Sequence, residues 1–248
     1  MKEKNFFDNI YKKYNIKDFV YSDPIQFPLK FKEKNDIEIV ALISSSFAYG
    51  NVKQIIASLN EIFSRMKEPY RYIKNLDDKK VKSDFYGFKH RFSDFNELGN
   101  FLLNIKRIYE KYPDIETAFK SKIKKDDRDV SNAIYLFVDE FCFYKTPTLI
   151  PDPSKKSAFK RFNLFLRWLV REDEIDIGIW KNIDKRLLII PLDTHMHQIS
   201  KELGITKRND TSMRTAIEIT DFFKKINPED PLKYDFSLTR APILKNFK

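Results

Sequence analysis

Glycine is scarce in this chain, with only 5 glycines among 248 residues. Loops that wrap phosphate groups need several glycines close together, and β architectures rich in tight turns need them throughout. By contrast, 23 Phe and 12 Tyr are present, and 42% of the residues are hydrophobic, which is enough for a sizeable core. We therefore expect a globular protein of the all-α class.

The balance of charges is basic. Lys and Arg outnumber Asp and Glu by 46 to 36, which gives a formal net charge of +10 and a sequence pI near 9.3. Such an excess attracts polyanions such as nucleic acid, although a general preference for lysine would produce the same charge. The charge alone therefore leaves open whether the protein binds nucleic acid or has no such partner.

Cysteine content and apolar runs bear on the compartment. The single cysteine, Cys142, excludes an intramolecular disulfide and a four-cysteine metal site. The beginning of the chain has no apolar signal region, and no apolar run approaches the roughly 20 residues that span a bilayer. These features predict a cytoplasmic protein.

Apolar residues recur at helical spacing in several separate segments. Between two of them, the charged run 120–129 is expected to be a solvated loop, and residues 68–92 lack a clean period and are expected to be a connector with short structure. No repeat or clear linker interrupts the chain, so residues 1–248 are predicted to form one domain. The helices are predicted over about residues 36–46, 52–65, 98–109, 130–141, 157–171, 193–203 and 212–226.

The predicted helix over 157–171 follows a proline-rich turn, and Ser154 or Ser157 is expected to cap it. Its beginning would offer unpaired N–H groups and a positive dipole end to a phosphate. Lys160, near that end and beside aromatic residues, is a candidate amine nucleophile. An ordinary solvated face would look the same, because Lys and Arg normally face water. The predicted polar face comprises Lys156, Lys160, Asn163, Arg167 and Arg171.

A carboxylate opens the next predicted helix. Asp193 or Thr194 is expected to cap residues 193–203, and that role alone would explain an Asp at this place. Beside a lysine, the same carboxylate could also stabilise a developing positive charge or move a proton. Asp193 to His197 also resembles the metal motif of amidohydrolase barrels, but those sites need further histidines, and none follows His197. No metal is therefore expected.

Together these segments resemble the helix-hairpin-helix DNA glycosylase superfamily. The resemblance rests on Lys160 and Asn163 in the spacing Lys-x-x-Asn, followed by Pro191-Leu192-Asp193-Thr194-His195, and it covers about residues 151–204. The whole chain is also similar to a bacterial family of unknown function, DUF2400, in its Lys-Arg-x-Asn-x-Phe-Leu-Arg-Trp and Pro-Leu-Asp-Thr-His segments. The resemblance to the glycosylase superfamily implies an all-α, glycosylase-like fold with two helical lobes around a cleft.

The resemblance also implies roles. Lys160 would attack the sugar C1′ of a nucleotide and form a Schiff base, and Asp193 would stabilise the oxocarbenium-like sugar. The substrate would be double-stranded DNA with a damaged base turned out of the stack, bound by a monomer without a cofactor. Candidates for contacts to the DNA are Lys155, Lys156, Ser157, Arg161 and Arg167. Candidates for the base pocket are Ser46, Tyr49, Asn51 and His195.

Two features depart from the superfamily. The Leu-Pro-Gly-Val-Gly hairpin that usually grips phosphate is replaced by residues 150–157, and 33 positions separate Lys160 from Asp193, which implies an insertion around 171–186. An archaeal branch acting on 8-oxoguanine has a similarly long spacing. The missing hairpin leaves a second hypothesis open, a non-catalytic nucleic-acid-binding module on the same scaffold. A structural or partner-binding helical protein is the third.

Overall fold

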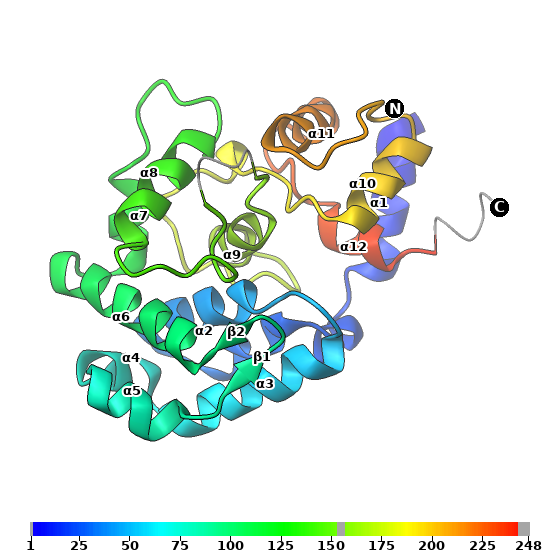
Figure 1. Ribbon diagram of the computed structural model, residues 1–248. Coiled ribbons are helices and arrows are strands. Elements are labelled where there is room, and N and C mark those ends of the chain that lie inside the picture. Colours follow the sequence, from blue (N-terminus) through cyan, green and yellow to red (C-terminus); the bar gives the residue numbers. More distant parts are fainter. Residues whose placement is uncertain (1, 153–156, 243–248) are drawn as a thin grey trace. The chain divides into compact units, whose positions relative to one another are not determined.

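The structure, a computed structural model, describes residues 2–152 and 157–242 (Figure 1). It is predominantly helical, as predicted, and the strands in these two ranges form one antiparallel pair. No helix in the described part of the chain is both long and apolar enough to cross a bilayer. The chain divides into two compact units. Among described residues, unit 1 comprises 2–21, 127–131 and 157–242, and unit 2 comprises 22–126 and 132–152.

Unit 2 is built around a buried helix, α2. Every residue of α2 from Ile37 to Ser46 is buried, so this helix is packed on all of its sides. Helix α4 packs against both α2 and α6, and α5 also packs against α6 (Figure 1). The elements of unit 2 are the 3-10 turns Pro24–Gln26 and Pro28–Lys30, α2 Lys34–Ser46, α3 Val52–Met66, α4 Pro69–Lys74, α5 Asp78–Phe85, β1 Lys89–His90, β2 Ser93–Asp94, α6 Phe95–Lys111, α7 Ile115–Lys120 and most of α8 Ser131–Phe141. A further 3-10 turn, Lys17–Ser22, runs along the chain from unit 1 into unit 2.

Unit 1 holds both tryptophans, Trp168 and Trp180, in its core. The Trp180 ring meets Phe165 edge to face, with the ring centroids 5.1 Å apart. Helix α12 packs against α1 and α10 (Figure 1). The helices of unit 1 are α1 Lys2–Tyr14, α9 Lys160–Val170, a 3-10 turn Lys185–Leu187, α10 Thr194–Glu202, α11 Met213–Ile226 and α12 Asp235–Arg240.

The boundaries of the long helices agree with the sequence patterns, and the exceptions have physical causes. Helix α9 begins at Lys160, three residues later than predicted, because the segment before it forms a tight turn. Ser154 lies outside the described residues. Helices α7 and α12 were not predicted, since six residues are too few to show a helical period. Helix α1 was also missed, although Phe7, Ile10 and Tyr14 in it recur at helical spacing.

Candidate functional site

The turn before α9 has an unusual backbone. Phe159, the residue before the helix, adopts the left-handed conformation with φ 46° and ψ 40°, which is costly for a residue with a bulky side chain. Two hydrogen bonds hold it: Phe159 N donates to Ser157 Oγ at 3.1 Å, and Asn163 Nδ2 reaches back to the carbonyl of Ala158 at 2.8 Å. Asn163 therefore fixes the turn that delivers Lys160 as the first residue of α9.

Asp193 stands at the beginning of α10, and the prediction that it caps this helix is confirmed. Its Oδ1 accepts a hydrogen bond from Met196 N at 2.7 Å. The other oxygen, Oδ2, lies 3.3 Å from Lys160 Nζ. Packing within unit 1 thus brings together the lysine and the carboxylate that stand 33 positions apart in the sequence.

The pair is open to solvent. The side chain of Lys160 is 38% exposed and that of Asp193 30% exposed, so a ligand can reach both groups. Lys160 occupies the first position of a helix, where the positive dipole end disfavours an ammonium group, and the carboxylate of Asp193 offsets that effect. A primary amine and a proton acceptor therefore share an accessible place at the beginnings of two helices.

Arg167 lies elsewhere than predicted. The expectation of a solvent-exposed basic face is wrong for this residue, which is 3% exposed, and for the equally buried Arg171. Arg167 Nε pairs with Asp176 at 3.2 Å and its Nη1 with Asp235. Arg171 pairs with Asp176, with Asp173 at 3.1 Å and with Asp230 at 2.8 Å. The two arginines are held by buried carboxylates and are not presented to a phosphate backbone.

The segment 171–186 explains this burial, because it folds back on the end of α9. Ile177 N donates to the carbonyl of Trp168 at 2.8 Å and Trp180 N to that of Leu169 at 2.7 Å. The backbone groups at the helix end are thereby satisfied. Asp173 and Asp176 of this segment form ion pairs with Arg171, so residues 171–186 supply carboxylates to the core of unit 1.

The buried ion pairs reach the candidate site through Asp235. Burial raises the pKa of the Asp235 carboxyl group, the Arg167 guanidinium opposes that rise, and the negative charge of Asp193 adds to it. The negative charge of Asp193 therefore acts on Asp235, one of the carboxylates that hold Arg167.

The other residues proposed for DNA contact have mixed positions. Lys155 and Lys156 lie outside the described residues. Ser157 is half-buried, and its backbone forms an isolated bridge with Ser212. Arg161 is half-buried on the first turn of α9. His195, a base-pocket candidate, is half-buried on the first turn of α10, so Lys160, Asp193, Arg161 and His195 all belong to the beginnings of two helices of unit 1.

The remaining base-pocket candidates belong to unit 2. Ser46 is buried at the end of α2, and Asn51 Oδ1 caps α3 by accepting a hydrogen bond from Lys53 N at 2.9 Å. The ring of Tyr49 stands edge-on to His90, with centroids 4.7 Å apart. Asn51 thus has a local structural role as a helix cap, and Tyr49 supports the β1–β2 pair.

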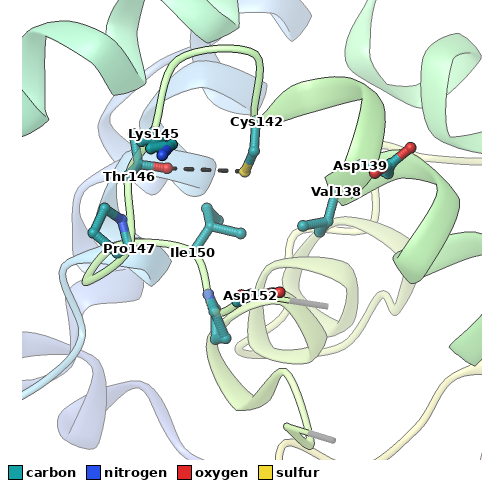
Figure 2. Close-up of a pocket in the computed structure, with 9 residues that line it drawn as sticks. Val138, Asp139, Cys142, Lys145, Thr146, Pro147, Ile150 and Asp152 are labelled. Atoms are coloured by element: carbon teal, nitrogen blue, oxygen red, sulfur yellow. Dashed lines mark hydrogen bonds between the residues drawn. The ribbon is translucent and has the colours of Figure 1, made fainter. Parts of the chain in front are cut away.

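A pocket of about 360 Å³ also lies in unit 2, between α8 and the loop that follows it (Figure 2). Figure 2 shows Cys142 beside Thr146, and their Sγ and Oγ1 atoms are 3.9 Å apart. Burial raises the pKa of the Cys142 thiol to about 11, so at neutral pH it is not the thiolate that nucleophilic chemistry needs. The lining residues are Val138, Asp139, Cys142, Lys145, Thr146, Pro147, Ile150, Pro151 and Asp152.

Comparisons with known proteins complete the description of the site. A family model described as "Protein of unknown function (DUF2400)" matches residues 23–244 and so includes Lys160, Asn163 and Asp193. No curated protein and no solved structure matches the chain. Over the residues that the structure describes, no three His, Cys, Asp or Glu side chains are grouped so as to hold a metal ion.

Proposed function

The chain belongs to the family described as protein of unknown function (DUF2400), and on that premise we propose that it is a DNA glycosylase that excises a damaged base through a Schiff base on Lys160. The scaffold of this proposal is a helix-hairpin-helix glycosylase-like fold, with double-stranded DNA as the substrate of a monomeric cytoplasmic protein. The predominantly helical structure and the net charge of +10 are compatible with it.

One observation carries the proposal, the separation of 3.3 Å between Lys160 Nζ and Asp193 Oδ2. At this distance Asp193 can take a proton from the ammonium group and leave a neutral amine. The Nζ lone pair then bonds to the sugar C1′ while the bond from C1′ to the base breaks, and the base leaves with the proton that Asp193 took, which restores the carboxylate. Opening of the sugar ring gives the Schiff base. During this step the carboxylate faces the positive charge that develops on the sugar.

The turn before α9 adds support. A left-handed Phe159 costs on the order of 1–3 kcal/mol, and such strain persists only where the surroundings enforce it. Here Asn163 enforces it, through its bond to the carbonyl of Ala158. The Lys-x-x-Asn spacing thereby acquires a physical meaning: the asparagine holds the backbone that positions the lysine.

Borohydride trapping tests the proposal. The purified protein is incubated with duplexes that carry an abasic site, 8-oxoguanine, uracil or an alkylated base, and borohydride reduces any Schiff base to a stable adduct. We expect an adduct with at least one duplex, and its loss in Lys160→Gln. Mass spectrometry of the adduct should place the modification on Lys160.

Two substitutions of Asp193 separate its two roles. Asn still caps a helix but carries no charge, whereas Ala loses both functions. We expect Asp193→Asn to keep the stability of the wild type and to slow trapping by at least about ten-fold, on the scale of general acid–base catalysis. Asp193→Ala should also cost about 1 kcal/mol of stability. Full trapping by Asp193→Asn would contradict the catalytic role of the carboxylate.

The absence of any adduct, together with salt-sensitive DNA binding, would refute the Schiff-base chemistry. It would favour the non-catalytic nucleic-acid-binding module instead, because phosphate contacts by lysine and arginine weaken steeply as salt rises. In that case the affinity should fall gradually as single basic residues are replaced, and Lys160→Gln should behave like any other such change.

A further inference from the structure

The tip of the β1–β2 hairpin in unit 2 carries two bulky residues that the turn itself does not require. Lys89 pairs with Asp94 and His90 with Ser93, so the connection is the two-residue turn Arg91-Phe92. Turns of this length require left-handed backbone and normally use Asn or Gly. Here Arg91 adopts φ 53°, and two large side chains occupy the tip. The turn therefore keeps bulky residues at a place where small ones would fold more easily.

The inward side of the hairpin is firmly fixed. His90 and Ser93 are buried, and the Tyr49 hydroxyl donates to the carbonyl of His90 at 3.2 Å and lies 2.8 Å from Ser93 Oγ. The His90 ring also contacts α3, where Ser58 Oγ lies 2.8 Å from His90 Nδ1. These bonds tie the hairpin to the end of α2 and to α3, so its outward side chains are presented on a rigid support.

Gly50 makes room for the tip. A Cβ at this position would lie 2.6 Å from Arg91 Cδ, so with any other residue the flexible arginine side chain would have to move. The guanidinium carbon of Arg91 lies 5.5 Å from the centre of the Phe92 ring. Phe92 itself is 77% exposed, so its ring is open to a ligand.

Two basic residues, Lys89 and Arg91, share the hairpin with Phe92, and Lys53 is a further exposed cation of unit 2. Lys89, Arg91 and Lys53 are exposed, and within the described ranges none of their side chains forms an ion pair with a carboxylate. Asp94, opposite Lys89 in the strand pair, is occupied as the cap of α6, where its Oδ1 accepts a hydrogen bond from Glu97 N at 2.9 Å. The exposed ring therefore shares its hairpin with two cations that form no ion pair among the described residues.

We propose that the hairpin tip is a base-stacking site for single-stranded nucleic acid. The Phe92 ring would stack on an unpaired base, and Arg91 and Lys89 would lie beside the adjoining phosphates. An exposed aromatic ring flanked by cations suits a flat, apolar base that is carried on a negatively charged chain. The site is separate from Lys160 and Asp193, so it can exist whether or not these residues form a Schiff base with DNA.

Phe143 provides a matched control in the same unit. It is also an exposed phenylalanine beside an arginine, but the guanidinium of Arg107 lies only 3.8 Å from its ring centre and occupies one face. A base has less room to stack there. Replacement of Phe143 by Ala should therefore leave binding of nucleic acid unchanged.

The test is fluorescence anisotropy with two labelled probes, a single-stranded oligothymidine and an abasic phosphodiester chain of the same length. We expect Phe92→Ala to bind oligothymidine at least about five-fold more weakly than the wild type, on the scale of one lost stacking contact. Binding of the abasic chain should not change, since it has no base to stack. An unchanged melting temperature would show that the exposed side chain was removed without unfolding.

Phe92→Trp gives a direct signal of stacking. The native Trp168 and Trp180 are buried, so quenching of indole emission by oligothymidine would report on position 92. Binding of oligothymidine by Phe92→Trp with wild-type affinity, together with quenching of its indole emission, supports the proposal. Wild-type affinity in Phe92→Ala, an equal loss with the abasic chain, an equal loss in Phe143→Ala, or no binding of oligothymidine by the wild type would each overturn it. None of these outcomes depends on borohydride trapping, so the two proposals stand or fall separately.

Discussion

Substitution of Asp176 by Ala should destabilise unit 1 strongly. This carboxylate pairs with both Arg167 and Arg171, and all three side chains are buried. Removal of one partner from a buried ion pair leaves an uncompensated charge and costs about 3–5 kcal/mol. Arg167 would retain Asp235, and Arg171 would retain Asp173 and Asp230, so we expect a value near the lower end, about 3 kcal/mol.

Tryptophan fluorescence makes this effect measurable in one unit. Trp168 and Trp180 both lie in the core of unit 1, so their emission during urea denaturation follows the unfolding of that unit. For a chain of this size, about 3 kcal/mol corresponds to a fall in melting temperature of roughly 6–12 °C. The urea midpoint should fall while the slope of the transition stays the same.

Glu172 is the matched control. It stands in the same return segment and pairs with Lys181, but the two side chains are 70% and 65% exposed. Exposed pairs contribute about 0–1 kcal/mol, so Glu172→Ala should be close to the wild type. If Asp176→Ala costs no more than Glu172→Ala, the buried ion pairs do not stabilise unit 1, and our reason for the burial of Arg167 is refuted.

Two further outcomes are expected. Burial raises the pKa of Glu140, but hydrogen bonds from Lys111 and Lys122 outweigh it and lower the pKa to about 2. A lowered carboxyl pKa stabilises the fold above the unfolded value of about 4.5, and this stabilisation is lost as the pH falls toward 2. Over this pH range the free energy of unfolding of the wild type, measured by urea denaturation, should fall by about 1–2 kcal/mol more than that of Glu140→Gln, after allowance for the exposed Lys111. Gly178→Ala should lower the melting temperature by more than Gly204→Ala does. Both glycines have positive φ, but only at Gly178 would a Cβ lie 2.8 Å from the Arg171 carbonyl oxygen. Equal falls in melting temperature would contradict this clash.

Local signals in the sequence were sufficient for most of the helical architecture. The apolar residues of α2 and the period of α6 and α11 identify these helices, because a helix buries residues at fixed spacing. The cap by Asp193 and the end of α10 before Gly204 follow in the same way, from side-chain and backbone preferences that act over a few residues. The order of Lys160 and Asp193 also made them candidates before any geometry was known.

Tertiary structure alone decided which charged groups are exposed. A helical projection placed Arg167 toward water, since isolated charges avoid burial. In the folded chain its partners are Asp176 and Asp235, 9 and 68 positions away, and no local pattern could have announced the second of them. The exposure of Phe92 could not be predicted from local sequence either, because it depends on the hydrogen bonds of Tyr49 and Ser58 to the hairpin. Spacing along the chain fixes which groups share a helix face, but only packing fixes which groups from distant segments meet.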